Sequence, residues 1–331
     1  MPLLLDARDP SAIGQAAQRL AEGSLVGLPT ETVYGLGADA DNASAVRAIF
    51  AAKGRPADHP LIVHVAGVDA LDDWADDVPA AARQLAAAFW PGPLTLVLRK
   101  LPRVPDVVTG GQDTVGLRCP DHPVALALLR EFGGGLAAPS ANRFGHVSPT
   151  SAAHVRAEFG DAVPVVLEGG DCTIGIESTI VDFTGDTPRI LRPGMLGRER
   201  IEAVIGPVEA GATAASPRAS GTLEAHYAPR TPLLLLPRAA LAQEASEQQA
   251  LGKSVQVLAL GALPGDTPGL ALPAEPAAYA HGLYAALREL DGRGANLLLA
   301  ERPPEGEAWL AIHDRLRRSA AGAGGYDGDP T

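Results

Sequence analysis

The sequence predicts a two-domain α/β protein, and three observations support this prediction. Up to about residue 206, short apolar runs rich in β-branched residues alternate with alanine-rich stretches of helical spacing. Between residues 207 and 231 this periodicity stops and Ala, Gly, Pro, Ser and Thr predominate, which is typical of a linker. The length of 331 residues also suits two domains better than one small module.

We expect the first domain to contain a mixed sheet flanked by helices. The expected strands are 24–28, 61–65, 95–98, 114–117, 136–138, 163–167, 179–183 and 189–192. The expected helices are 43–53, 79–89, 123–132 and 151–159. Two of these helices end at breakers, WPGP (90–93) and GGG (133–135), as helix C-termini require.

After the linker, strands and helices alternate in a regular order. Strands are expected at 233–236, 255–260 and 296–300, and helices at 239–250, 277–290 and 308–320. This order predicts a small parallel sheet with helices outside it. We therefore expect a mixed α/β domain over 1–206, a linker over 207–231, a second α/β domain over 232–320 and a disordered tail over 321–331.

Composition excludes several classes of function. The formal net charge of −12 repels phosphate backbones and aromatic residues make up only 4%, so we expect weak or no direct nucleic-acid binding. Cys119 and Cys172 lie far apart without a CxxC pattern, which favours reduced core thiols over a zinc site or a disulfide. No apolar run approaches the ~18 residues that span a bilayer, and no signal peptide is visible. We expect a cytoplasmic protein with no membrane contact.

The motifs of common phosphate loops, dinucleotide sites, zinc hydrolases and esterases are missing, so the candidate sites are polar residues in apolar or glycine-rich surroundings. The first lies at residues 28–37, where Thr30, Thr32 and Tyr34 precede a turn expected at Gly35 and Gly37. One interpretation is an ordinary strand and turn. The other is a hydroxyl-lined loop at a strand end, where open α/β sheets place ligands.

The second candidate is a pair of cations at the end of the helix expected over 43–53. Lys53 falls on the same apolar stripe as Val46 and Ile49, where a solvated lysine is unexpected, and Arg55 follows it. One interpretation is that the cations stabilise the helix C-terminus. The other is a phosphate clamp, with Lys as a point charge and Arg as a planar fork. Only three of the 27 cationic residues are Lys, which mildly favours the clamp.

The third candidate follows the expected strand 136–138. Ser140 and Asn142 come directly after Pro139, and Ser148 precedes Pro149. Ser148 is a good helix N-cap, with Pro at the first helical position, and an N-cap also faces anions. Capping and anion binding are compatible interpretations.

Other polar residues lie at the edges of expected strands. Arg118 ends one strand and Ser178 precedes another, and both have structural as well as functional interpretations. His64 lies within the apolar run 61–65, so a satisfied core histidine is the default interpretation. His59 precedes Pro60 in a loop and has no specific interpretation from its surroundings.

Taken together, these stretches resemble the threonylcarbamoyl-AMP synthase family, which has a YrdC-like domain, in its long two-domain form. In the first 200 residues the resemblance rests on PTETVYGLG (29–37), KGRP (53–56), PLIVH (60–64), WPGPLT (90–95), GLRCP (116–120), PSAN (139–142) and ST (178–179). Further on it rests on SGTLEAHYAP (220–229), GLYAALR (282–288) and IHDRL (312–316). The resemblance implies a YrdC-like twisted mixed sheet followed by a small Rossmann-like C-terminal domain.

The resemblance also implies a reaction. The family condenses L-threonine, bicarbonate or CO2, and ATP into threonylcarbamoyl-AMP and pyrophosphate. The product then supplies a tRNA-modifying transferase that forms threonylcarbamoyladenosine. Mg²⁺ would arrive with ATP, without direct protein ligands.

Residue roles follow from the matching motifs. The implied phosphate-side catalytic group is Lys53, Arg55, Ser140 and Asn142. The implied threonine contacts are Thr32, His64, Arg118, Ala138 and Ser178. The implied ATP contacts are Arg55, His59, Thr114, Ser140, Ser148, Arg192 and Tyr227. Tyr227 would reach from the linker over the mouth of the groove. His59 stands where the family usually has Asn, and an imidazole nitrogen can replace an amide donor.

The residues fit this chemistry without a protein nucleophile. Attack of a carbamate on the α-phosphate needs aligned reactants and cations for the charge on the departing pyrophosphate. Lys53 and Arg55, with Mg²⁺, would supply that charge. The linker would shield the labile intermediate from water.

Three alternatives stay open at this point. One is a non-catalytic module that binds double-stranded RNA or tRNA, although the basic stripe it requires is not evident. Another is a carbamoyl-transfer protein with the same domain, although its acylphosphatase and zinc-finger segments are not found in this chain. In the third, the C-terminal α/β unit is an independent ligand-binding domain with a regulatory role.

Overall fold

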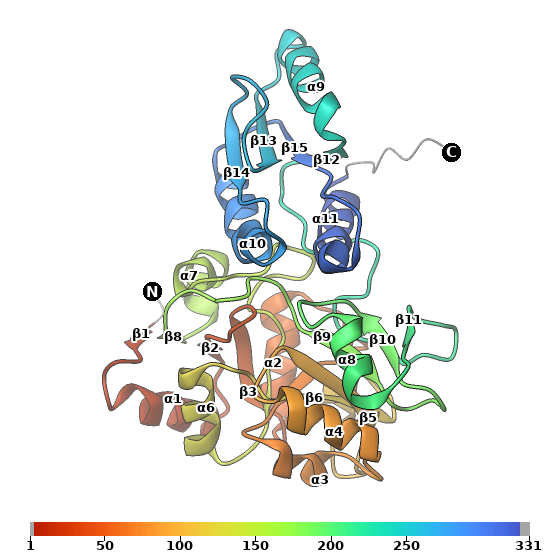
Figure 1. Cartoon of the computed structure of the whole chain (residues 1–331). Helices are drawn as coiled ribbons and strands as arrows, with labels where there is room; N and C mark the ends of the chain where they lie inside the picture. Colours follow the sequence, from red (N-terminus) through yellow and green to blue (C-terminus); the bar gives the residue numbers. More distant parts are fainter. Residues whose placement is uncertain (1–2, 325–331) are drawn as a thin grey trace. The chain divides into compact units, whose positions relative to one another are not determined.

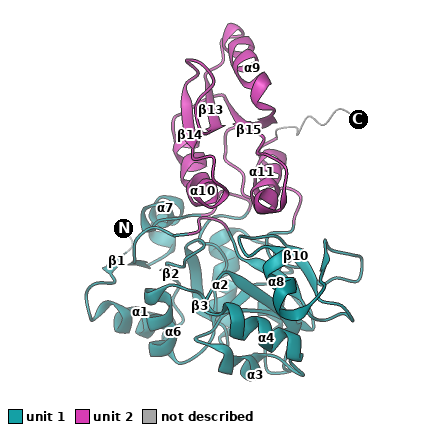
Figure 2. Ribbon diagram, in the orientation of Figure 1, with its two compact units in different colours: residues 1–144, 149–173, 177–222 teal, residues 145–148, 174–176, 223–331 magenta. Residues whose placement is uncertain are grey.

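The computed structural model describes residues 3–324, which form two compact units (Figure 2). Of the described residues, the first unit comprises 3–144, 149–173 and 177–222. The second comprises 223–324 together with two short segments, 145–148 and 174–176. Two short segments from the middle of the chain therefore belong to the C-terminal unit. The predicted limits of the linker, at residues 206 and 231, stay predictions.

The first unit is built on a mixed sheet, as predicted. Within residues 3–324 its strand order is β1-β8-β2-β3-β7-β4-β6-β5-β9-β10-β11, with both parallel and antiparallel pairs. The strands are β1 (Leu3–Asp6), β2 (Val26–Leu28), β3 (Gly35–Asp39), β4 (Ile62–His64), β5 (Leu94–Arg99), β6 (Thr114–Arg118), β7 (Leu136–Ala137), β8 (Val165–Glu168), β9 (Thr179–Asp182), β10 (Arg189–Arg192) and β11 (Glu209–Ala210).

The helices of this unit begin and end where local chemistry dictates. The Asn42 side chain accepts hydrogen bonds from the first backbone N–H groups of α2, and Gly54 ends that helix at φ +61°. His122 caps α6 in the same way, and Gly133 ends it at φ +75°. The helices are α1 (Ala12–Ala21), α2 (Ala43–Lys53), α3 (Leu71–Trp74), α4 (Ala80–Phe89), α5 (Asp106–Thr109), α6 (Pro123–Phe132), α7 (Ala152–Phe159) and α8 (Arg198–Ile205).

Helices cover both faces of the sheet. Consecutive residues of β7 pack into different cores because strand side chains alternate between faces: Ala137 lies in one core and Leu136 in the other. Leu85 of α4 packs into the first core, while Leu128 of α6 packs into the second, next to α1 (Figure 1). With its faces filled, the sheet leaves its strand ends and connecting loops to hold the polar residues.

The second unit is built on a smaller sheet in which all strand pairs are parallel, as predicted. Its strand order is β12-β15-β13-β14, and α10 packs on β13 and β14 while α11 packs on β12 (Figure 1). The elements are β12 (Leu233–Leu236), α9 (Arg238–Ala250), β13 (Val255–Leu260), β14 (Gly269–Leu272), α10 (Pro276–Gly292), β15 (Leu297–Glu301) and α11 (Leu310–Gly322).

The structure corrects several expectations. Gly35 and Gly37 form part of β3, not a turn, and a Cβ on Gly37 would lie 2.7 Å from the Leu28 side chain, so close strand packing explains that glycine. The elements β1, α1, α8 and β14 were not expected. The predicted tail begins inside α11, which runs to Gly322, and residues 325–331 lie outside the described part. No helix within residues 3–324 is long and apolar enough to cross a membrane.

Candidate active site

His64 and Arg118 lie side by side on neighbouring strands. They are register partners in the parallel pair β4–β6, so their side chains share one face of the sheet. Both residues are buried, and neither ring nitrogen of His64 has a hydrogen-bond partner of normal geometry. Burial, and then the Arg118 guanidinium, lower the pKa of His64 well below its usual value, which keeps the ring neutral at pH 7.

The loop between β2 and β3 presents a buried carboxylate to Arg118. Glu31 Oε2 lies 2.7 Å from Arg118 Nη2, and the two side chains are only 4% and 5% exposed. The loop is held by Thr30, whose hydroxyl donates to the Val33 carbonyl at 2.6 Å and lies 2.9 Å from the Thr32 hydroxyl. Thr32, which follows Glu31 in the sequence, is fully buried. The hydroxyl-lined loop predicted from sequence therefore exists, and it also contains an acidic residue that was not singled out.

Lys53 fixes the loop that follows β7. Its Nζ donates hydrogen bonds of 2.5 Å to the carbonyl oxygens of both Ser140 and Asn142, and its own carbonyl accepts from the Phe144 N–H at 2.8 Å. The loop also pairs with β3 through a bridge between Gly35 and Ser140. Burial, and then Arg55, lower the pKa of Lys53 well below its ordinary value. The two carbonyl acceptors favour the protonated form, and an ammonium has three donors, so one donor is left for a ligand.

Arg55 is the second cation of the predicted clamp. It follows Gly54, and its Nη2 donates to the Pro60 carbonyl at 2.9 Å. Its guanidinium also lies 5.8 Å from the centre of the Phe144 ring, and the His59 ring packs edge-on against that same ring at 5.3 Å. Burial and the charge of Arg55 lower the pKa of His59. Lys53, Arg55, His59 and the loop after β7 thus form one connected cluster.

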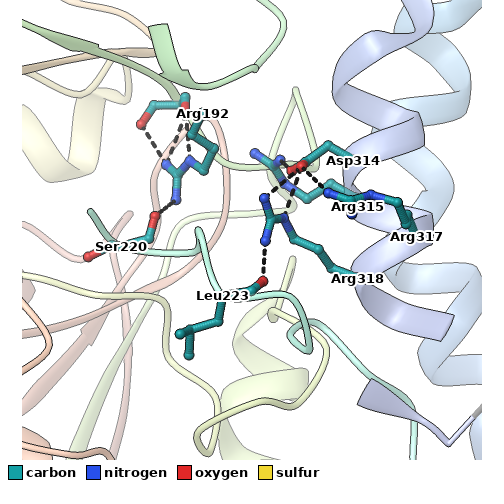
Figure 3. A network of polar contacts seen from close by, with 8 residues as sticks. Arg192, Ser220, Leu223, Asp314, Arg315, Arg317 and Arg318 are labelled. Carbon is teal, nitrogen blue, oxygen red and sulfur yellow. Dashed lines mark hydrogen bonds and ion pairs between the residues drawn. The ribbon is translucent and has the colours of Figure 1, made fainter. Parts of the chain in front are cut away.

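Arg192 joins β10 to the start of β9. It donates to the Ser178 carbonyl through Nε at 3.1 Å and Nη2 at 2.9 Å, and to the Ser178 hydroxyl at 3.1 Å. Its Nη1 donates to the Ser220 carbonyl at 2.8 Å (Figure 3). The Ser178 hydroxyl is also 2.8 Å from the Thr95 hydroxyl. Arg192 therefore has a clear structural role in addition to the predicted nucleotide contact.

A small pocket opens beside this network. Its volume is about 20 Å³. Thr114, predicted as an ATP contact, is in its wall, and Ser220 closes one side with a hydroxyl that donates to the Pro60 carbonyl at 2.7 Å. The other lining residues are Pro60, Leu61, Ile62, Thr95, Val97, Gly116, Ile180, Arg218 and Ala219. Ala138, on the far side of β4, donates its N–H to the Ile62 carbonyl at 3.0 Å.

Two predicted ATP contacts, Ser148 and Tyr227, belong to the second unit. Ser148 is not a helix N-cap: α7 begins at Ala152, next to the expected start at 151, and the Ser151 hydroxyl accepts the capping hydrogen bond from the His154 N–H. The Ser148 carbonyl instead accepts a hydrogen bond from Arg288. The nucleotide contacts of Ser148 and Tyr227 stay predictions.

Tyr227 is held tightly within that unit. Its backbone is left-handed (φ +59°), its ring stacks on Tyr284 at 5.7 Å, and the Arg315 guanidinium lies 5.2 Å from the ring centre. The Tyr227 carbonyl accepts from the Ser319 hydroxyl at 2.8 Å.

Asp314 forms ion pairs with three neighbouring arginines of α11, Arg315, Arg317 and Arg318 (Figure 3). Arg318 also donates to the Leu223 carbonyl.

The remaining observations concern metals and thiols. Residues 3–324 contain no group of three or more His, Cys, Asp or Glu side chains placed to hold a metal ion. Cys119 and Cys172 are free and buried, as predicted. Burial raises the pKa of the Cys119 thiol to about 11 and that of Cys172 to about 12, so both are unreactive near neutral pH.

Comparison with known proteins covers almost the whole chain. Residues 18–194 match the family described as "Telomere recombination", and residues 196–321 match the one described as "Threonylcarbamoyl-AMP synthase, C-terminal domain". The threonylcarbamoyl-AMP synthase of Pyrococcus abyssi is 43% identical over 316 residues, covering 92% of this chain and 93% of that protein. The Bacillus subtilis protein of the same name is 42% identical over 333 residues, covering 96% and 95%.

Solved structures agree with these relatives. The crystal structure of P. abyssi Sua5 complexed with L-threonine superposes with a TM-score of 0.92 at 40% identity, covering 98% of each chain. The similarity therefore includes both units, and the predicted fold class is confirmed.

Proposed function

The chain belongs to the threonylcarbamoyl-AMP synthase family, and we propose that it condenses L-threonine, bicarbonate or CO2, and ATP into threonylcarbamoyl-AMP and pyrophosphate. It is a nucleotidyltransferase. The observation that best supports this proposal is the buried pair His64–Arg118, because both ring nitrogens of His64 and two guanidinium nitrogens of Arg118 have no hydrogen-bond partner. A relative of high identity has been crystallised with L-threonine, and an amino acid is a ligand that such a pair suits.

We propose that threonine lies against the side of the site formed by the ends of β4 and β6. An arginine fork binds a carboxylate with two parallel hydrogen bonds, so Arg118 is the candidate for the threonine carboxylate. His64 is neutral and offers one donor and one acceptor, which suits a hydroxyl. The other proposed threonine contacts are Thr32, Ala138 and Ser178.

The proposed phosphate side is the cluster around Lys53. The transfer needs alignment of the carbamate with the α-phosphate and positive charge near the departing pyrophosphate, and no nucleophile from the protein. Lys53 holds the Ser140–Asn142 loop with two hydrogen bonds and keeps one donor for a phosphate oxygen. Arg55 brings a second cation to the same cluster. His59, Thr114 and Arg192 are proposed to contact the nucleotide.

Mg²⁺ enters this proposal as part of the substrate MgATP. Among residues 3–324, no cluster of three potential ligands competes for it. Bound to the phosphates, the ion would add charge stabilisation of the kind that phosphoryl and nucleotidyl transfer require.

The product is proposed to leave for a separate tRNA-modifying transferase in the cytoplasm. A formal net charge of −12 disfavours tight binding of tRNA by this chain itself. The chain would then make a small-molecule reagent and pass it on.

Pyrophosphate release tests the reaction and the clamp together. Purified protein with L-threonine, bicarbonate and MgATP is expected to release pyrophosphate, and omission of threonine or bicarbonate should stop the release. The double variant Lys53→Ala/Arg55→Ala should lose this activity. Undiminished release by the double variant would remove the clamp from the proposal, whereas no release by the wild-type protein would contradict the reaction.

A further inference from the structure

Three buried polar side chains of the first unit meet without satisfying one another. Six of their atoms have no hydrogen-bond partner: both oxygens of Glu31, both ring nitrogens of His64, and Nε and Nη2 of Arg118. Glu31 and Arg118 form an ion pair at 2.7 Å, but its angle is not that of a hydrogen bond. Buried polar groups are nearly always hydrogen-bonded, so such a concentration of unsatisfied atoms indicates a place for a polar ligand.

The charges of this cluster define the ligand that fits it. Glu31 is negative, Arg118 is positive, and the lowered pKa of His64 keeps that ring neutral. A ligand with separate positive and negative ends can satisfy both charges at once. A simple anion would instead leave the buried Glu31 carboxylate facing a second negative charge. An α-amino acid has this dipolar character. Its carboxylate suits Arg118, which leaves its ammonium group for Glu31.

We propose that Glu31 binds the ammonium group of L-threonine and takes one proton from it before the carbamate forms. This inference rests on the proposed function and adds a residue to it. An ammonium has no lone pair, so it must lose a proton before its nitrogen attacks carbon. A carboxylate within hydrogen-bond reach of that nitrogen is the natural acceptor.

The step balances with bicarbonate as the co-reactant. The threonine ammonium gives one proton to Glu31 and becomes an amine. The amine nitrogen forms a bond to the bicarbonate carbon, and the C–OH bond of bicarbonate breaks. The departing hydroxide takes a second proton from that nitrogen and leaves as water. The products are the N-carboxylate of threonine, water and a protonated Glu31, whose proton returns to solvent after the product leaves.

The other titratable groups around Glu31 do not compete for this role. Besides Arg118 they are Cys119 and His122, on the segment between β6 and α6, and Cys172, on the loop after β8. Asp121 and Asp171 lie next to this group. Burial raises the pKa of both thiols to about 11 or above, and burial lowers the pKa of His122. All three stay neutral between about pH 7 and pH 9.5, so a change of activity in that range does not come from them.

The pH profile of Glu31→Gln tests this proposal. Gln keeps the shape and hydrogen-bonding reach of Glu but accepts no proton, so kcat/KM for threonine near pH 7 should fall ~100-fold or more. Because free threonine loses its ammonium proton as pH rises, the variant should recover at least ~10-fold of that loss by about pH 9.5. Wild type and Glu31→Asp should show no such alkaline recovery. Undiminished activity of Glu31→Gln, or a loss that does not change with pH, would overturn the proposal.

A second measurement uses only the wild-type protein, because loss of one partner of a buried ion pair can prevent folding. Calorimetry compares L-threonine with 3-hydroxybutyrate, which lacks the amino group. The analogue should bind at least ~10-fold more weakly if its missing ammonium is the partner of Glu31. Equal binding would overturn the proposal even if Glu31→Gln does not fold. The binding comparison requires no turnover. Failure of the wild-type protein to form threonylcarbamoyl-AMP would therefore count against the proposed function and not against the role of Glu31.

Discussion

Lys53 donates a hydrogen bond of 2.5 Å to the carbonyl oxygen of Asn142, across 89 residues of sequence. The same ammonium binds the Ser140 carbonyl, so one buried side chain at the end of α2 sets the backbone of the loop after β7. The loop and the cation therefore form one unit, and a change in either should affect both stability and activity.

Lys53→Met should show this double effect. Methionine keeps most of the buried volume but leaves two carbonyl oxygens unsatisfied, which should lower the free energy of unfolding by about 2–4 kcal/mol. Pyrophosphate release should fall in the same variant. Urea unfolding and the release assay measure the two effects. Lys253→Met is the matched control because Lys253 is exposed in the second unit, and its effect should stay within ~0.5 kcal/mol. Equal stabilities of the two variants would refute this interpretation of Lys53.

Acid should destabilise the protein through His64. Its pKa in the folded state lies well below the usual 6.5, because of burial and then Arg118. Between these two pKa values the unfolded chain binds more protons, so the free energy of unfolding rises with pH and falls on acidification below about 6.5. One histidine contributes at most about 1.4 kcal/mol per pH unit.

Urea unfolding near pH 7, 6 and 5 measures this dependence. His64→Gln should reduce the slope, while His281→Gln, which changes an exposed histidine of α10, should leave it unchanged. His59 and His122 also have lowered pKa values and act in the same direction, so some slope should persist in His64→Gln. An identical slope in wild type and His64→Gln would contradict the neutral buried ring.

Arg192→Lys should loosen the segment that carries Ser220. The Arg192 guanidinium donates to the Ser178 and Ser220 carbonyls at the same time, and a lysine cannot reproduce this fork. The free energy of unfolding should therefore fall by about 1–3 kcal/mol. Limited proteolysis should then cut faster around residues 212–222. Arg47→Lys, on the exposed side of α2, is the control. Unchanged cleavage in Arg192→Lys would show that other contacts hold the segment.

Tyr279→Phe should stabilise the second unit. The Tyr279 hydroxyl is buried without a hydrogen-bond partner, and its ring packs edge-on against Trp309 at 5.6 Å. Phenylalanine keeps the ring contact and removes the unsatisfied group, so the free energy of unfolding should rise by about 1 kcal/mol. Thermal unfolding measures the change. A decrease instead would mean that the hydroxyl is hydrogen-bonded in solution.

Local signals explain which elements could be predicted. The helix expected over 43–53 agrees with α2 at both ends, because Asn42 and Gly54 mark its termini chemically. The strand β3 was missed because Gly35 and Gly37 favour a turn locally. Pairing with β2 and β7 outweighs that local preference, and such pairing depends on residues far away in sequence.

The candidate site likewise contains residues that local motifs predict and residues that only distant contacts reveal. Motifs located Thr32, but its neighbour Glu31 acquires meaning only through Arg118, 87 positions later, when β6 lies beside β4. A carboxylate between two threonines in apolar surroundings was the available signal. Similarly, nothing local indicates that Ser148 belongs to the second unit, because that assignment depends on contacts with residues such as Arg288.

Mass spectrometry of the reaction product tests the central claim most directly. Purified protein with L-threonine, MgATP and carbon-13 bicarbonate should yield threonylcarbamoyl-AMP containing a single labelled carbon, together with pyrophosphate. L-Serine should give less product, because one methyl group contributes only ~1–3 kcal/mol of discrimination. Pyrophosphate release without a labelled adduct, or an adduct that forms without threonine, would contradict the account.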